Sequence, residues 1–448
     1  MIESDAFKLL LINLFHLNPD DIANIFCTTF NKMMVLLVTL ADKHQACPYC
    51  GFTAPKIKEY VTKEITHSAL TTQKCIIKYR ARRYKCPCCG KTYYEFNPFV
   101  FKSQKISILT VHNILKDLKD FNETFTSVAR RYHVSPTSVS TIFDNHVDIG
   151  RNPLPEIINF DEVYAFKSEK SKYVCVLLDF KKQIPVDVLP NRKKEYLLNY
   201  FQKIPLEERK KVKYACSDMY EVYRDVVHKV FPCSCMLLDY FHLSQDFHRK
   251  MNEVRIKVMK GYKDDKASDE YYLLKKFNWL LFKNPEDEDK YGRLFDVERE
   301  RKYNSHFKSY MNYYDLRRKL LEINNGLTIC YSLKLELVDF YSKSTIDNAQ
   351  VNLEHLIRNC IDTNIEEMIA FSNNLINWKQ EIINSFTIVG TEYKVEADKG
   401  QVVVCNKKVN NAIIENRNKI IKCIKNNANG YTNWSRFRNR VMYVLDPN

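Results

Sequence analysis

The sequence predicts a multidomain α+β chain in which a β-rich metal-binding module and a small helical module precede a larger α/β domain. Two cysteine pairs with one local pattern lie within the first 100 residues. Helical periodicity with clear capping residues follows over residues 101–150, and from residue 151 short apolar strands alternate with helices. We therefore expect domains over residues 1–100, 101–150 and 151–448, the last interrupted by a helical insertion at about 250–400.

The composition is that of an ordinary globular protein, with 45% hydrophobic and 27% charged residues among 448. Lys and Arg number 69 against 54 Asp and Glu, and the resulting net charge of +15 favours a polyanionic partner such as nucleic acid. The apolar run over residues 33–41 is too short to span a membrane, and the N-terminus lacks the basic start of a signal peptide. We expect a cytoplasmic chain without membrane contact, whose cysteines are thiols or metal ligands.

Four cysteines form the first candidate site. Cys47 and Cys50, and then Cys86 and Cys89, each occur in the pattern Cys-Pro-x-Cys-Gly. Because two such turns present four thiolates to one tetrahedral ion, the spacing predicts a structural Zn²⁺ site with no open ligand position. The alternative is a pair of unrelated turns that hold free thiols. Cys88 is an additional sulfur within the second turn.

The segment between the cysteine pairs is typical of β-structure, with strands expected over residues 59–65 and 75–84. Its second strand interleaves Arg80, Arg82 and Arg83 with tyrosines, a composition that suits phosphate contact and base stacking. The alternative is an ordinary solvated strand face.

Residues 106–147 have the pattern of a helix-turn-helix. Apolar residues recur at helical spacing over residues 106–119, and Ser135 followed by Pro136 is a typical helix start. The helix from Pro136 to about residue 147 would present short polar side chains to base edges. The alternative is a three-helix packing unit that does not bind DNA. The DNA-contacting residues expected in this module are Arg130, Arg131, Thr137, Ser138, Ser140 and Thr141.

From residue 151 the element order is three strands, helix, strand, helix, strand and helix. This is the order of a ribonuclease-H-like fold, in which the first and fourth strands are neighbours. Asp161 and Asp218 follow those two strands, so we expect them to lie side by side. Two adjacent carboxylates repel unless a cation joins them, and hard oxygen ligands select Mg²⁺ or Mn²⁺. The alternative for each residue alone is a strand-end or helix-capping carboxylate.

A third carboxylate is expected from Glu415, which shares one face of a predicted helix with Asn411, Asn418 and Lys422. Such a polar stripe suits a metal and phosphates, although an ordinary solvated face has the same pattern. The other carboxylates that could take this place are Glu162, Asp239 and Glu396.

These motifs together resemble the ISL3 group of insertion-sequence transposases, which are of the DDE type. The resemblance extends over nearly the whole chain and rests on Cys47 to Cys89, on residues 106–147, on Asn159-Phe-Asp161-Glu162, Ser217-Asp218-Met-Tyr220 and Asp239-Tyr-Phe-His242, and on Asn411-x-x-x-Glu415-x-x-Asn418 and Gly430-Tyr431. Ala412 departs from the pattern, because a Gly is more usual there. Residues 389–408 depart from it as a local elaboration.

The resemblance implies a DNA transposase with Asp161, Asp218 and Glu415 as its catalytic triad. Its implied partners are the terminal repeats of its element and a target DNA, bound by a homodimer or higher oligomer in a bacterial cell, at the nucleoid. Its cofactors would be Mg²⁺ or Mn²⁺, with Zn²⁺ structural. The residues expected to support the active site are Arg192, Asp239, His242, Asn411, Asn418 and Lys422. Two competing functions are a DNA-binding regulator without catalysis and a nuclease of the same fold that cuts but does not join.

Overall fold

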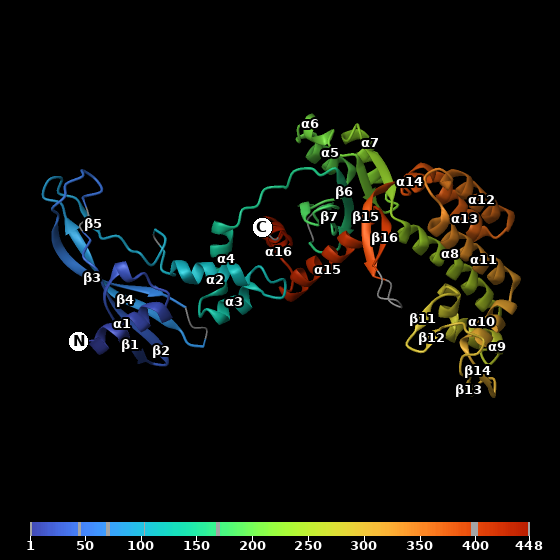
Figure 1. Cartoon of the computed structure of the whole chain (residues 1–448), viewed down its shortest axis with the longest axis horizontal. Coiled ribbons are helices and arrows are strands. Elements are labelled where there is room, and N and C mark those ends of the chain that lie inside the picture. Colours follow the sequence, from blue (N-terminus) through green and yellow to red (C-terminus); the bar gives the residue numbers. More distant parts are fainter. Residues whose placement is uncertain are drawn as a thin grey trace. The chain divides into compact units, whose positions relative to one another are not determined.

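The computed structural model describes residues 2–43, 46–68, 72–102, 104–166, 171–395 and 402–446, with side chains left undescribed before residue 6 and over 392–405. The chain divides into two compact units (Figure 1). Unit 1 contains residues 1–151, 164–168 and 418–448, and unit 2 contains residues 152–163 and 169–417. The three-domain division expected from the sequence stays a prediction.

Unit 1 begins with helix α1 (Ile2–Leu14) and a five-stranded sheet in the order β1-β2-β4-β3, with β5 paired to β4. The two strands expected between the cysteine pairs are confirmed. Helix α1 and the first two strands were not predicted; the apolar run over residues 33–41 is β2, whose Leu36 and Val38 are buried in the module's core. The strands are β1 (Ile22–Phe30), β2 (Met33–Leu40), β3 (Lys56–Thr66), β4 (Cys75–Lys85) and β5 (Thr92–Tyr94).

Three helices follow in unit 1: α2 (Ile108–Asp117), α3 (Phe125–Arg131) and α4 (Pro136–His146). Each begins at a residue whose side chain accepts a backbone N–H, namely Ser107, Thr124 and Ser135. The helix start predicted at Ser135 and Pro136 is therefore confirmed. The helices enclose a core that includes Val139, Ile142 and Phe143.

The last helix of the chain, α16 (Trp434–Leu445), packs on these three helices. Its Arg440 is 1% exposed and donates hydrogen bonds of 2.9 Å to the carbonyls of Asp120 and Glu123. Tyr443 packs edge-on against Phe143. The helical module is thus completed by residues from the far end of the sequence, which the sequence analysis did not predict.

Unit 2 contains a second five-stranded sheet in the order β10-β9-β6-β7-β8. Strand β6 is antiparallel to β7 and parallel to β9, so the first and fourth strands are neighbours, as predicted. Helices α5 (Lys194–Gln202) and α7 (Glu221–Val230) pack through Phe201 and Tyr223 on Phe160 of β6. The strands are β6 (Ile157–Val163), β7 (Val174–Asp179), β8 (Pro185–Leu189), β9 (Tyr214–Ser217) and β10 (Cys235–Leu238), and a short helix α6 (Leu206–Arg209) precedes β9.

Helices dominate the segment between β10 and the helix that carries Glu415, as expected, and they enclose a core of their own. Short hairpins interrupt them, and of residues 389–408 the described parts, 389–395 and 402–408, belong to the antiparallel pair β15 and β16. In sequence order the elements are α8 (Tyr240–Gly261), α9 (Asp269–Lys276), β11 (Glu288–Asp289), β12 (Gly292–Arg293), β13 (Lys302–Asn304), β14 (Ser309–Met311), α10 (Tyr313–Glu322), α11 (Asn325–Lys343), α12 (Ala349–Asp362), α13 (Glu366–Asn377), α14 (Lys379–Asn384), β15 (Ile388–Val395), β16 (Val402–Lys408) and α15 (Ala412–Asn427).

Among the described residues, none of the helices has the length and apolar character that crossing a membrane requires.

Candidate functional site

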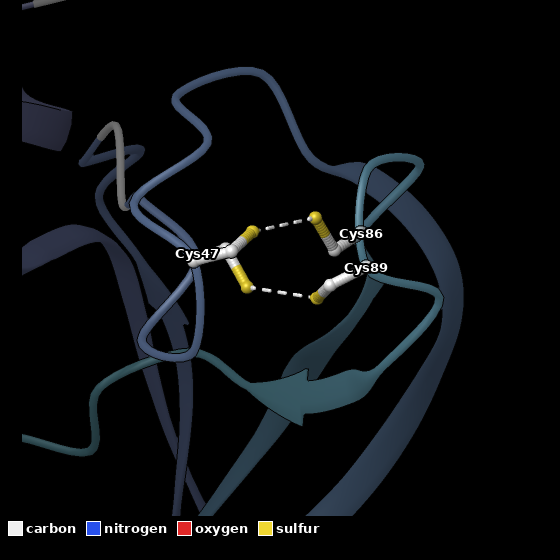
Figure 2. Close-up of side chains that lie close together, drawn as sticks. Cys47, Cys86 and Cys89 are labelled. Carbon is white, nitrogen blue, oxygen red and sulfur yellow. Dashed lines mark hydrogen bonds between the residues drawn. The ribbon is translucent and has the colours of Figure 1, made fainter.

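The four predicted cysteine ligands lie together in unit 1 (Figure 2). The sulfur of Cys47 is 3.7 Å from that of Cys89, and the sulfur of Cys50 is 3.5 Å from that of Cys86. All four sulfurs lie within 4.8 Å of one another, which is the arrangement that a tetrahedral Zn²⁺ site requires. A hydrogen bond from the backbone of Cys89 contributes most to lowering the pKa of the Cys86 thiol to about 7. The pKa of the Cys50 thiol is instead raised to about 12, because the lowering effect of a backbone hydrogen bond at Phe52 is outweighed by burial and the three neighbouring thiols.

The two cysteine turns have the same backbone geometry. Gly51 and Gly90 adopt φ values of 75° and 71°, a region that glycine enters at little cost. The N–H of Gly51 donates to the carbonyl of Cys47, and the N–H of Gly90 donates to the carbonyl of Cys86. Each turn is therefore fixed by its own backbone before a metal joins the two.

The three arginines expected on β4 have different surroundings. Arg80 is exposed and lies over the ring of Tyr60. Arg83 pairs with Glu59 at 2.6 Å and is about one third exposed. Arg82 is only 15% exposed and pairs with the buried Glu95 at 2.8 Å. Arg82 thus ties strands of the module together, and Arg80 has the most accessible guanidinium of the three.

In the module α2–α4, which the sequence predicts to be a helix-turn-helix, Thr137 and Thr141 of α4 are exposed, while Ser138 and Ser140 are half-buried. The hydroxyl of Ser138 is hydrogen-bonded to that of the capping residue Ser135, and the hydroxyl of Ser140 donates to the Thr137 carbonyl. Three of the four residues line a groove of about 520 Å³; they are Thr137, Ser138 and Thr141.

The two arginines expected on α3 also differ. Arg130 is exposed, whereas Arg131 forms ion pairs with both Asp117 and Glu123. These pairs raise the pKa of the Arg131 guanidinium and hold α3 against the neighbouring chain segments. Arg130 therefore has a side chain available to a ligand, and Arg131 is held within the protein.

In unit 2 three aspartates lie on or just after neighbouring strands of the sheet. Asn159 of β6 pairs with Cys216 of β9, and Asp161 and Asp218 each lie two residues beyond this pair. Ser217 of β9 pairs with Leu238 of β10, and Asp218 and Asp239 are the next residues along the chain. Asp161 lies inside β6 rather than after it, which corrects the expected strand end.

Two of these carboxylates are buried without enough hydrogen bonds to compensate for the loss of water. Burial raises the pKa of Asp218 and of Asp239 above the ordinary range of an aspartate. Oδ1 of Asp218 and Oδ2 of Asp239 are buried and have no hydrogen-bond partner in the part of the chain that the structure describes. The backbone N–H of Glu162 donates to Asp161 Oδ1 at 2.7 Å. Buried anionic oxygens of this kind fit a site that binds a cation.

Asn411 attaches the N-terminus of α15 to this edge of the sheet. It is fully buried, and its Oδ1 accepts a hydrogen bond of 2.7 Å from Nδ2 of Asn159, which also reaches the carbonyl of Asn410 at 2.8 Å. The backbone N–H of Asn411 donates to Asp239 Oδ1 at 3.4 Å. One helical turn later, Glu415 lies beside Asp239 and His242, and ligand atoms of these three residues lie within 4.8 Å of one another.

The remaining predicted residues have separate environments. Arg192 forms an ion pair with Glu162, whose other oxygen accepts a hydrogen bond of 3.3 Å from Tyr223. On α15, Asn418 is buried and Lys422 is exposed; both belong to unit 1, whereas Glu415 belongs to unit 2. Glu396, one of the alternative third carboxylates, lies outside the described residues.

Asn159 is the one residue of this arrangement that sequence reasoning did not single out for a role of its own. The sequence does indicate a role for Asn159, because it is an amide within the otherwise apolar run Ile157–Phe160. A fully buried polar side chain in a central strand requires a partner, and here the partner is Asn411.

Comparison with known proteins identifies the family. Residues 158–397 match the family model described as transposase, that of the DDE-type ISL3 group. The chain is also similar to the transposase for insertion sequence element IS1001 of Bordetella parapertussis, with 20% identity over 409 residues, which cover 91% of this chain and 90% of that protein. Because the family match spans more than half of its 448 residues, the chain belongs to the ISL3 family of DDE transposases.

Proposed function

We propose that this protein binds the terminal inverted repeats of its own insertion sequence, cuts the DNA strands there and joins the freed 3′ ends to a target DNA. The observation that supports the proposal is that Asp161 lies on β6 and Asp218 follows the neighbouring β9, while Asn411, one helical turn before Glu415, is hydrogen-bonded to Asn159 of the same sheet. Because two element ends have to be held together, we propose that a homodimer or larger assembly acts on the DNA.

The carboxylate edge suits divalent cations. Asp218 contributes a buried oxygen without a hydrogen-bond partner, and burial raises its pKa, so a cation there would relieve the cost of the buried charge. We propose that Asp161, Asp218 and Glu415 hold Mg²⁺ or Mn²⁺. Bound at such a site, these ions acidify the attacking hydroxyl or water and stabilise the leaving 3′ oxygen.

The fold holds the three carboxylates in place, and a cleft gives access to Asp218. Asp161 is held by strand pairing and Asp218 directly follows β9, whereas Glu415 depends on the docking of α15. Asp218 and His242 line an open cleft of about 270 Å³, and the 60% exposed side chain of Arg249 lies at the same cleft. The guanidinium of Arg249 is paired with Asp246, which lines the same cleft.

End recognition is assigned to unit 1, with residues 1–100 as the zinc module and residues 101–150 as the helix-turn-helix. Arg80, Arg83 and Arg130 would contact phosphates, while Arg82 and Arg131 would hold the surfaces that present them. The polar residues Thr137, Ser138, Ser140 and Thr141 would read base edges. Binding should weaken steeply with salt, since each phosphate contact adds about 0.9 to the log–log slope.

The test uses the DNA that flanks the gene, in which imperfect inverted repeats define the end substrate. We expect Asp161→Asn, Asp218→Asn and Glu415→Gln each to abolish strand cleavage but to leave end binding unchanged, because each removes a metal ligand and not a DNA contact. The matched control is Asp225→Asn, at a surface aspartate paired with Lys194.

Each other outcome has a defined meaning. Cleavage without joining identifies a nuclease, and binding without cleavage by the wild-type protein identifies a regulator. Normal cutting by Glu415→Gln removes Glu415 from the site and moves the third carboxylate to Asp239, Glu162 or Glu396.

A further inference from the structure

Three side chains from separate elements meet beside the carboxylate edge. Asp239 follows β10, His242 lies in the first turn of α8, and Glu415 lies in the first turn of α15. Nε2 of His242 is 3.8 Å from Asp239 Oδ2 and 3.9 Å from Glu415 Oε1. An imidazole nitrogen therefore faces two carboxylates at once.

The polar atoms at the centre of this cluster have no hydrogen-bond partners among the described residues. Asp239 Oδ2 and His242 Nε2 are both buried without one, and the Asp239 side chain is only 4% exposed. The other oxygen of Asp239 faces the backbone N–H of Asn411, which fixes the carboxylate and leaves Oδ2 directed toward His242. Buried polar atoms without hydrogen-bond partners cost free energy, and a bound ligand would remove this cost.

The spacing fits a cation better than a direct contact. Separations of 3.8 and 3.9 Å are too long for hydrogen bonds between the imidazole and either carboxylate. They are shorter than about 4.2 Å, which is twice the ~2.1 Å bond of a small divalent ion to oxygen or nitrogen. A phosphate is disfavoured in the same space because the two carboxylates repel it.

We propose that Asp239, His242 and Glu415 together bind one divalent cation, and that the imidazole nitrogen makes this site prefer a transition ion such as Mn²⁺ to Mg²⁺. The inference rests on the proposed function and deepens it, since Glu415 is shared with the proposed catalytic set. Mg²⁺ is held almost entirely by oxygen ligands, whereas first-row transition ions accept imidazole readily. Asp239 and His242 would thereby serve as metal ligands.

The test measures the nitrogen ligand directly. Full-length protein with its zinc retained is loaded with Mn²⁺ and studied by pulsed electron paramagnetic resonance, which detects a ¹⁴N nucleus bonded to Mn²⁺. We expect a nitrogen coupling in the wild-type protein that disappears in His242→Ala. The matched control is His306→Ala, because His306 lies 2.9 Å from Asp269 and has a side chain 23% exposed, against 24% for His242. The control should retain the coupling.

A second measurement tests whether the Asp239 carboxylate binds the cation. Asp239→Asn keeps an oxygen for the N–H of Asn411 but removes the negative charge, so Mn²⁺ affinity measured by titration calorimetry should fall at least about tenfold. In His242→Ala, Mn²⁺ affinity should fall more than Mg²⁺ affinity. The proposal is overturned if the wild-type protein shows no nitrogen coupling, whether or not Mn²⁺ binds, or if His242→Ala retains it.

Failure of this inference can be told apart from failure of the proposed function. If Asp218→Asn abolishes cleavage while the Mn²⁺ spectrum lacks nitrogen, only the assignment of His242 is wrong. If the nitrogen coupling is present but Asp218→Asn cuts DNA normally, the cation site exists and the proposed catalytic set is wrong.

Discussion

The cysteine cluster of unit 1 and the Asp239–His242–Glu415 cluster of unit 2 are built in opposite ways. Each cysteine turn supplies two ligands within four residues and is closed by its own backbone hydrogen bond. The second cluster joins residues from three elements and depends on the docking of α15 through Asn411. The first site is therefore local in sequence, and the second exists only once the domain has folded.

The difference has an energetic side. Four thiolates around Zn²⁺ add folding free energy to the module that carries them. The carboxylate edge instead contains buried oxygens without partners, which cost free energy until a cation or substrate arrives. The first cluster thus has the properties of a structural site. The second has the properties expected of a functional site, which lowers the stability of the fold in return for binding a ligand.

The largest expected effect comes from removing the local site. Cys47→Ser combined with Cys86→Ser should abolish zinc binding and unfold the N-terminal module, because a structural Zn²⁺ contributes about 10 kcal/mol or more in small zinc modules. Zinc content by mass spectrometry and thermal unfolding measure the loss, and chelation should reproduce it. Cys88→Ser is the matched control, since Cys88 is exposed within the same turn. Full zinc retention by the double variant would contradict the assignment.

An intermediate effect is expected from the packing of α16 on helices α2–α4, because this module is completed by residues from the far end of the sequence. Arg440 of α16 is buried and donates to the carbonyls of Asp120 and Glu123, so Arg440→Ala should destabilise the helix-turn-helix by about 3 kcal/mol. The control is Arg436→Ala on the same helix, whose partly exposed pair with Asp144 contributes about 1 kcal/mol or less. Chemical denaturation measures both.

The same packing predicts the behaviour of fragments. A chain that ends at residue 150 lacks α16, so we expect it to bind the element ends more weakly than the full-length protein at equal salt. Equal stability of Arg440→Ala and Arg436→Ala, together with full binding by the fragment, would mean that the helix-turn-helix is independent of α16.

The contrast also explains what the sequence could predict. The cysteine turns, the helix start at Ser135 and the order of the strands follow from local spacing and periodicity, and the structure confirms them. The pairing of β6, which carries Asp161, with β9, which precedes Asp218, followed from strand order. The packing of α16 on helices α2–α4 did not follow from the sequence, because a contact between residues about 300 positions apart leaves no local pattern.

The ion pairs of Arg82 and Arg131 were equally hidden in the sequence. Both residues lie in basic segments that suit DNA contact, and only the folded structure shows that Glu95 and Asp117 engage them. A charged side chain in a basic run can serve either a ligand or the fold, and its partners decide between the two.

The smallest expected effect tests how the assembled site is held. Asn411→Ala removes one of the two acceptors of the buried Asn159 amide, so the free energy of unfolding should fall by about 1–3 kcal/mol. Loss of this contact should also lower Mn²⁺ affinity, because Glu415 would no longer be held beside Asp239. Asn159→Ala should have a similar effect, and the double variant should cost little more than either single one, since both substitutions remove the same hydrogen bond. Strictly additive losses in the double-mutant cycle would show that the two amides act independently, and that something other than this pair positions α15.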